Sequence, residues 1–221
     1  MKHIVVDLEM NQTRREAFLS TGCSTETIEI GAVMLDENYN EISCFKTYVR
    51  PEYNDTIVGK ITKLTGITYE MVADALGFNE VLKSFSGWCL SAKEKTEIYA
   101  WGDTDYSQIS KEIALKNYEV TENEKHLFSE PWNDFQKEFD RVIGFQKNLS
   151  LKTALFTLGI DFLGQEHDAL CDARNTGILF KYFKDEKLFK TTLKKIKEVM
   201  EPEEKGVTLG DMFDFSKFKR S

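Results

Sequence analysis

Residues 3–10 read His-Ile-Val-Val-Asp-Leu-Glu-Met and place an apolar run directly before two acids. The aliphatic residues 4–6 are typical of a short strand that is buried on both faces. Side chains two positions apart leave a strand from the same face, so Asp7 and Glu9 would point out of it together. Neighbouring carboxylates repel and raise each other's pKa unless a cation lies between them. A strand end, where both acids are simply solvated, is the alternative that this short pattern alone favours.

The segments that follow predict an antiparallel start to a sheet. Residues 28–35 and 43–49 both have the composition of strands and are joined by the turn-rich residues 36–40. A further strand is expected at residues 97–101. Helical spacing of apolar residues recurs at 78–88, 105–116, 150–158 and 169–183, and in the lysine-rich stretch 187–200. Strands first and helices later predict an α/β fold in which helices flank a mixed sheet.

The length and composition indicate one folded domain followed by a tail. The chain has 221 residues, 41% of them hydrophobic, and three prolines. We expect residues 1–185 to form the domain and residues 186–221 to form a C-terminal helix and tail, with Pro202 ending that helix. The tail is too apolar to stay exposed, so we expect it to dock on the same domain, with binding of a partner protein as the alternative. Its apolar residues are Leu209, Met212, Phe213, Phe215 and Phe218.

Charge and cysteine usage exclude several classes of protein. A formal net charge of −8 argues against a protein that wraps nucleic acid in lysines, so any such partner must be held locally. Four scattered cysteines without a Cys-x-x-Cys pair suggest neither a zinc site nor a disulfide framework. The first apolar run meets a carboxylate after three residues, too soon for a signal peptide or membrane span. We therefore expect a cytoplasmic protein without membrane contact.

A histidine and two acids lie together in residues 166–172, which read Glu-His-Asp-Ala-Leu-Cys-Asp. Asp168 suits a helix N-cap, which makes His167 the residue before the cap and Asp172 the fourth helical position. Those two positions meet in a hydrophobic staple, so we expect an imidazole and a carboxylate at one corner of the helix. Gly164 predicts a loop that can move, and an imidazole there suits a general base. A capping or surface role is the alternative for the histidine taken alone.

A second pair of acids follows the strand expected at residues 97–101. Residues 99–105 read Tyr-Ala-Trp-Gly-Asp-Thr-Asp, and a helix is expected directly afterwards. Mixed sheets often present functional groups at the C-terminal ends of their strands. Either Asp103 or Asp105 is therefore a candidate functional acid, and the other then serves as a helix cap. Trp101 is expected to belong to the core.

Together these motifs resemble the DnaQ-like, or DEDDh, 3′-to-5′ exonuclease family of the RNase H-like superfamily. The family has Asp-x-Glu on its first strand, a middle Asp, and His-x4-Asp near the end of the domain. The matching residues here are Asp7, Glu9, Asp105, His167 and Asp172. Further matches at residues 28–33, 61–67, 151–152 and 172–176 extend the resemblance over about residues 3–183.

Within that family, two motifs are similar to the subgroup that contains the KapD sporulation inhibitor and the enhanced-RNA-interference exonucleases. They are residues 7–11, Asp-Leu-Glu-Met-Asn, and residues 101–105, Trp-Gly-Asp-Thr-Asp. Alignment on the second motif selects Asp105 as the metal-site acid. The pair Gln165-Glu166 is a departure, because relatives often have a basic residue before the histidine.

The resemblance implies an RNase H-like fold, with a mixed five-stranded sheet flanked by helices. It also implies that the four acids bind two Mg²⁺ or Mn²⁺ ions and that His167 deprotonates the attacking water. Met10 stands where relatives wedge the terminal base, although packing in the core is an equal alternative. The expected reaction releases nucleoside 5′-monophosphates from the 3′ end of single-stranded nucleic acid, with RNA favoured over DNA.

Two other functions fit the same residues. A proofreading exonuclease of a DNA polymerase would use the same catalytic set, and the tail could then dock to its partner. An inactive regulatory module that binds protein or nucleic acid is the third reading, although all five catalytic residue types are present. The negative net charge agrees with metal-dependent binding, since clustered carboxylates repel phosphate until cations invert the local field.

Overall fold

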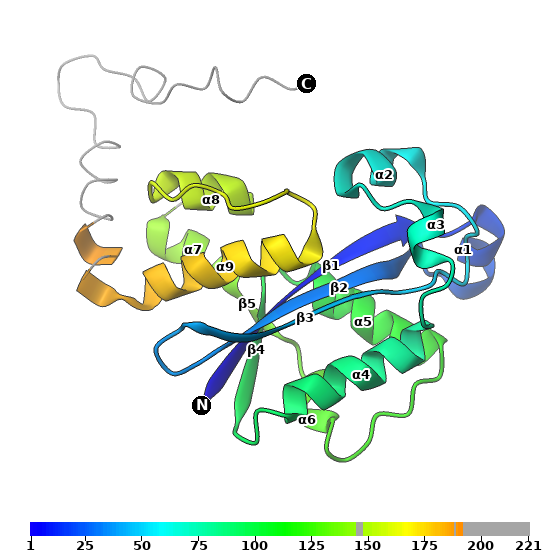
Figure 1. The fold of residues 1–221 in the computed structure, drawn as a ribbon, viewed down its shortest axis with the longest axis horizontal. Coiled ribbons are helices and arrows are strands. Elements are labelled where there is room, and N and C mark those ends of the chain that lie inside the picture. The colour runs from blue at the N-terminus through cyan, green and yellow to red at the C-terminus, as the bar shows by residue number, and fades with distance from the viewer. Residues whose placement is uncertain (145–147, 188, 192–221) are drawn as a thin grey trace.

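The computed structural model describes residues 1–144, 148–187 and 189–191, and its centre is a twisted five-stranded sheet (Figure 1). The strands are β1 (Lys2–Gln12), β2 (Thr25–Leu35), β3 (Glu41–Tyr48), β4 (Thr96–Ala100) and β5 (Asn133–Asp134). They lie in the order β3-β2-β1-β4-β5. The pairs β1–β2 and β2–β3 are antiparallel, whereas β1–β4 and β4–β5 are parallel. The antiparallel start and the mixed sheet are therefore confirmed.

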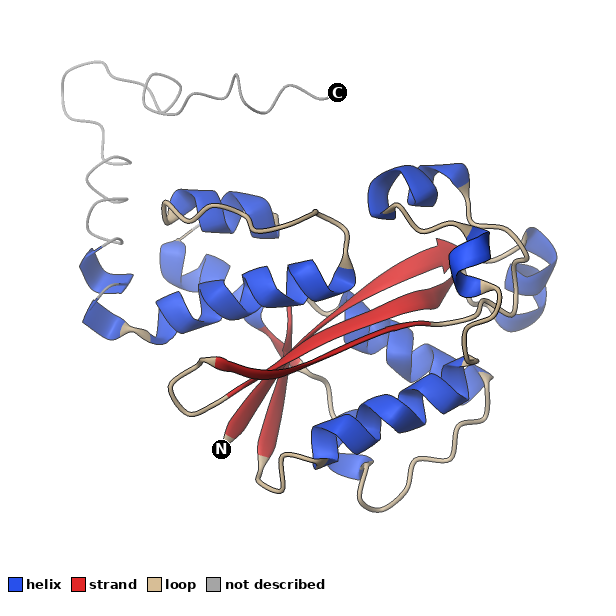
Figure 2. Ribbon diagram, in the orientation of Figure 1, coloured by secondary structure: helices blue, strands red, loops and turns tan. Residues whose placement is uncertain are grey.

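Helices cover both faces of this sheet (Figure 2). They are α1 (Arg15–Thr21), α2 (Gly59–Thr65), α3 (Tyr69–Val72), α4 (Phe78–Leu90), α5 (Thr104–Leu115), α6 (Lys125–Phe128), α7 (Phe135–Ile143), α8 (Leu151–Thr157) and α9 (Ala169–Lys184). Helices α4, α5 and α6 lie on one face, and α7, α8 and α9 lie on the other. The short helices α1, α2 and α3 stand beside the C-terminal end of β1. That end of the sheet is thus framed by separate segments of the chain.

Strand β1 divides the hydrophobic core into two clusters. Its even-numbered residues 4, 6 and 8 pack in a cluster with α4, whereas Val5 belongs to the cluster that includes α7, α8 and α9. Successive side chains of a strand point to opposite faces. The same alternation directs Asp7 and Glu9 to the face that α9 covers. Burial of the strand therefore determines which layer the two acids meet.

Gly31 of β2 allows α9 to pack directly on the sheet. A Cβ atom at this position would overlap the backbone C of Ala169 and the backbone N of Leu170. Gly31 is also the cross-strand partner of Asp7. The first turn of α9 consequently lies beside Asp7, because no side chain on β2 holds the two apart.

Most of the expected elements are present, whereas the helices α1, α2, α3, α6 and α7 and the strand β5 were not predicted from the residue pattern. Helix α7 was not predicted, although Phe135, Phe139 and Ile143 recur at helical spacing and all three are buried. Trp101, expected in the core, packs edge-on against Phe135 and is half-buried. Apart from Lys187 and residues 189–191, the helix expected at 187–200 and the tail after it lie outside the described residues. Within the described ranges, none of the helices combines the length and the apolar composition that crossing a membrane requires.

Replacement of Gly31 by alanine tests the close contact between β2 and α9. We expect Gly31→Ala to lower the free energy of unfolding by about 1 to 3 kcal/mol, because a helix backbone must shift to admit the methyl group. Gly87→Ala in α4 is the matched control, since a Cβ there meets nothing within 4 Å and alanine favours a helix by about 0.5 to 1 kcal/mol. Urea unfolding should give changes of opposite sign. Equal stability of both variants would contradict the packing.

Candidate active site

Strand β1 presents Asp7 and Glu9 from its interior and not from its end. The strand continues through Gln12, and its pairing with β2 shifts register between Glu9 and Met10. Glu9 is only 9% exposed. The alternative of two solvated acids at a strand end is therefore wrong. Met10 is half-buried and packs against the core cluster, which agrees with the alternative that it packs in the core.

The acid that joins them from α5 is Asp105 and not Asp103. Pairing between β1 and β4 ends at Ala100, so the backbone N–H of Leu8 lies beyond the partner strand. Asp105 accepts a hydrogen bond from Leu8 there and is 7% exposed. Asp103 is exposed and occupies the N-cap position of α5, but its side chain makes no capping hydrogen bond. Asp103 therefore occupies the N-cap position that was expected for the other acid, but its side chain does not cap the helix.

The fourth acid and the histidine come from the start of α9. The Asp168 side chain accepts a hydrogen bond from the backbone N–H of Cys171 at 3.0 Å, which confirms it as the N-cap. Asp172 Oδ2 accepts the backbone N–H of His167 at 3.1 Å. His167 has a left-handed backbone with φ of 62°, a conformation that is uncommon outside glycine. The expected meeting of these two residues at one corner of the helix is confirmed.

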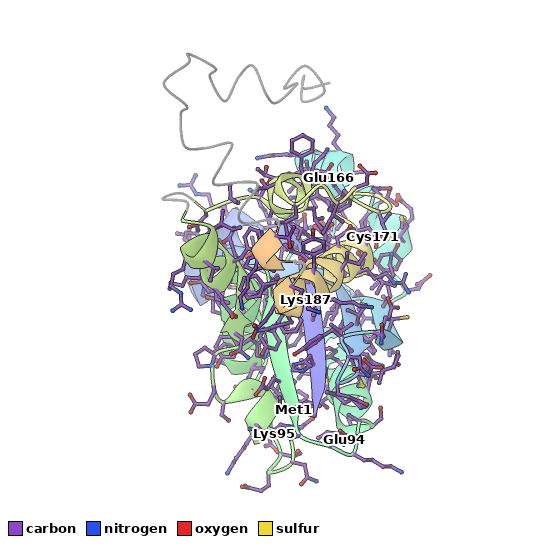
Figure 3. All side chains as sticks on the ribbon, turned by 90° about the vertical axis from the view of Figure 1, so that its left-hand side faces the viewer. Met1, Glu94, Lys95, Glu166, Cys171 and Lys187 are labelled. Carbon is purple, nitrogen blue, oxygen red and sulfur yellow. The ribbon has the colours of Figure 1, made fainter. Side chains whose placement is uncertain are left out.

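These segments converge at one end of the molecule. Ligand atoms of Glu9, His167 and Asp172 all lie within 4.8 Å of one another. In Figure 3, Glu166 and Cys171, which directly precede His167 and Asp172 in the sequence, lie in the half of the molecule away from Met1. All five residues expected at the site are therefore close together, since Asp105 and Asp172 act electrostatically on both Asp7 and Glu9.

Burial and mutual repulsion raise the pKa of every acid in the cluster. Burial is the largest cause in each case, followed for Asp7 and Glu9 by the neighbouring carboxylates. The pKa of Asp7 lies well above its usual range, and that of Glu9 rises to about 9. The pKa rises to about 7 for both Asp105 and Asp172, where hydrogen bonds from the backbone of Leu8 and His167 oppose the shift. The cluster therefore needs either protons or cations to be stable at neutral pH.

The donor set fits divalent cations that prefer oxygen ligands. Mg²⁺ and Mn²⁺ bind carboxylates in proteins. Among the described residues, Asp172 Oδ1 is a buried acceptor without a hydrogen-bond partner. A buried acceptor of this kind normally has a partner. A cation held between these carboxylates would supply it.

Two supporting residues were not singled out in the sequence. Glu29 is 1% exposed, lies opposite Glu9 on β2, and accepts the backbone N–H of Ala169 at 3.0 Å. Asn11 is fully buried and accepts the backbone N–H of Val58 at 3.0 Å, which fixes the chain directly before α2. Both are polar residues at alternate positions of buried strands. A polar residue at an inward-facing position of a strand was the signal that could have identified them. Such a side chain is buried only where it has a partner.

The loop before His167 is linked to two helices. Gln165 Nε2 donates to the carbonyl oxygen of Thr65 at the end of α2, over 3.2 Å. Glu166 forms an ion pair with Lys152 of α8. Gln165 and Glu166 therefore both make contacts within the protein. They connect the histidine loop to α2 on one side and to α8 on the other.

Comparison with known proteins identifies relatives over most of the chain. The family model described as RNase_T, Exonuclease, matches residues 4–180. ERI1 exoribonuclease 2 of Danio rerio is 31% identical over 196 residues, which cover 80% of this chain and 34% of that protein. The 3′-5′ exoribonuclease 1 of Mus musculus is 31% identical over 158 residues, which cover 68% of this chain and 44% of that protein. The chain thus spans less than half the length of either relative.

A solved structure shows the same fold. The nuclease domain of 3′hExo, described as a DEDDh family member bound to rAMP, has a TM-score of 0.71 at 24% identity. The match covers 85% of this chain and 94% of that one. The RNase H-like architecture expected from the motifs is confirmed by this likeness.

The raised pKa values predict that the metal-free protein loses stability as pH rises. A carboxyl that binds its proton more tightly in the folded state stabilises the fold below its unfolded pKa of about 4. That contribution disappears as pH rises through about 7 for Asp105 and Asp172 and about 9 for Glu9. Thermal unfolding in a chelator between pH 4 and 9 measures the loss. Millimolar Mn²⁺ should restore the melting temperature at pH 8, because cations bind the folded state.

Two variants separate the cluster from general charge effects. Asp7→Asn should raise the metal-free melting temperature at pH 8 and remove most of the gain from Mn²⁺, because it deletes one of the repelling ligands. Asp103→Asn should change both quantities far less, because the exposed charge of Asp103 raises the pKa of Asp105 only from a position that solvent screens. A wild-type melting temperature indifferent to both pH and Mn²⁺ would contradict a cluster of buried carboxylates.

Proposed function

Because this chain belongs to the Exonuclease family whose model matches residues 4–180, we propose that it is a metal-dependent 3′-to-5′ exonuclease acting on single-stranded RNA. The convergence of four carboxylates and one imidazole around residues 7–9 of β1 carries this proposal. The names of the relatives, which are exoribonucleases, support RNA over DNA. The products are nucleoside 5′-monophosphates and a strand one nucleotide shorter.

The acids of the cluster would hold two Mg²⁺ or Mn²⁺ ions. The residues are Asp7, Glu9, Asp105 and Asp172. Cations bound there would supply positive charge that stabilises the attacking and leaving oxygens of an in-line displacement. The carboxylates are preorganised for this task by β1, α5 and α9, so few of their side-chain rotations remain to be lost on binding.

His167 is the proposed general base that activates the attacking water. Its imidazole is exposed at the edge of the cluster, and its backbone is held to Asp172 by a hydrogen bond. The imidazole takes a proton from water, and the water oxygen attacks phosphorus at the terminal phosphodiester. The bond from phosphorus to the 3′ oxygen of the preceding nucleotide then breaks. Met10, which packs partly against the core, is the candidate contact for the terminal base through the part of its side chain that remains exposed.

Matched end-labelled oligonucleotides test the reaction and its substrate. With Mn²⁺ we expect 5′-labelled RNA to shorten one nucleotide at a time and to release nucleoside 5′-monophosphates, faster than DNA of the same sequence. A blocked 3′ end should prevent the reaction. Asp105→Asn should abolish turnover, whereas Asp103→Asn, whose carboxyl is exposed at the N-cap of the same helix, should remain active.

Other outcomes identify the rival functions. Preference for DNA together with copurification of a polymerase would favour a proofreading exonuclease. Binding of oligonucleotides without Mn²⁺-dependent release of nucleotides would favour an inactive regulatory module. Activity that survives in Asp105→Asn but not in Asp103→Asn would show that the middle acid is wrongly assigned.

Substitution of the histidine separates proton transfer from metal binding. His167→Ala should lower kcat by about 10²- to 10⁴-fold, the usual contribution of general acid–base catalysis. The Mn²⁺-dependent rise in melting temperature should persist, because the four carboxylates remain. Asp172→Asn should lose both properties. Full activity of His167→Ala would assign the histidine to the loop alone and require another base.

A further inference from the structure

An ion-paired group outside the proposed catalytic set holds the start of α9 from the side of β3. Lys46 Nζ lies 3.3 Å from Glu29 Oε1 and 2.5 Å from Asp168 Oδ2. Glu29 Oε2 in turn accepts the backbone N–H of Ala169, and Asp168 Oδ1 accepts that of Cys171. We call the side chains of Glu29, Lys46 and Asp168 the β3 clamp. Its two carboxylates accept two backbone N–H groups of the first turn of α9, and Lys46 joins the carboxylates.

The register of the sheet places the clamp opposite the proposed metal ligands. Gly31 pairs with Asp7 on β1 and with Lys46 on β3, so the three residues form one row across the sheet. The first turn of α9 lies over Gly31. The helix start therefore sits between Asp7 on one side and Lys46 on the other. A sideways shift of this turn would move Asp172 relative to the acids of β1.

Charge explains why the clamp contains a lysine. Glu29 and Asp168 both act on Glu9 as neighbouring negative charges, in addition to the carboxylates of the cluster itself. Without a cation, these two acids would repel each other and drive the helix start away from β2. Lys46 offsets that repulsion with two charge-assisted contacts, which are stronger than neutral hydrogen bonds. Its side chain is 34% exposed, whereas that of Glu29 is 2% exposed.

We propose that Lys46 is a positioning residue, which acts through Glu29 and Asp168 to set the place of Asp172 and His167 against β1. The effect on turnover rests on the proposed exonuclease function, whereas the effect on metal binding does not. Groups that orient metal ligands typically contribute about 10- to 100-fold to metal affinity or activity. A displacement of about 1 Å in such a site is enough to lower a rate by about 100-fold.

The same two elements offer a matched control. Arg174 of α9 forms an ion pair with Glu41 of β3 at 2.9 Å, with both side chains more exposed than those of the clamp. This pair also joins the helix to the edge strand, but it lies further along α9 and contacts no backbone donor of the first turn. Loss of an exposed ion pair has little effect on stability. Arg174→Met and Glu41→Gln therefore loosen the same contact without touching the clamp.

The experiment compares these variants in the full chain. Mn²⁺ binding is measured calorimetrically without substrate, and kcat and KM are measured with a single-stranded RNA oligonucleotide. Lys46→Met should weaken Mn²⁺ binding by about 10- to 100-fold and lower kcat, with little change in KM. Lys46→Arg should recover most of both losses, because it restores the cation. Arg174→Met and Glu41→Gln should bind Mn²⁺ as the wild type does.

The failures of the two proposals are distinguishable. Wild-type protein that binds Mn²⁺ but releases no nucleotide would overturn the exonuclease function, while the binding data still test the clamp. Wild-type Mn²⁺ affinity in Lys46→Met, or an equal loss in Arg174→Met, would overturn the positioning role. If circular dichroism shows Lys46→Met to be unfolded, Asp168→Asn takes its place, since asparagine keeps the helix cap but removes the charge. Undiminished Mn²⁺ binding in that variant would also overturn the proposal.

Discussion

The rest of the molecule depends on the repulsion among carboxylates that are buried together around residues 7–9 of β1. Burial disfavours the ionised form of each acid, and the neighbouring charges add to that cost. A core of this kind persists only where the surrounding structure fixes the side chains and a counter-charge is available. The fold supplies rigid elements on both faces of the sheet, and the proposed cations supply the charge.

The arrangement of strands and helices follows from bringing distant segments to that point. β1 lies in the middle of the sheet, so its two faces are covered by different helices; its acids point to the layer of α9, and Asp105 of α5 joins them past the end of β4. Gly31 lets the helix approach, Glu29 binds its first backbone donor, and the end of β4 leaves Leu8 free to bind Asp105. Each contact satisfies a polar group that burial would otherwise leave without a partner.

Local sequence patterns were sufficient to predict the position of a site residue where that position depends on a single strand or helix. The alternation in β1 placed Asp7 and Glu9 on one face, and the N-cap rule fixed the positions of Asp168 and Asp172 on α9. The same reasoning missed α7, whose apolar residues follow a helical period but are separated by strongly polar ones. It also left Asp103 and Asp105 equivalent, because both stand at the start of one helix and only the motif alignment preferred the second.

By itself, therefore, the sequence determined the family, the residue types of the site and the elements that carry them, since these depend on spacing within short segments. The tertiary structure alone decided which acid of the α5 pair is buried, and that Glu29 and Lys46 support the first turn of α9. Those outcomes arise from the register between strands and from the close packing over Gly31. Contacts between residues far apart in the chain leave no period in the sequence, because each partner is chosen by geometry that only the folded chain creates.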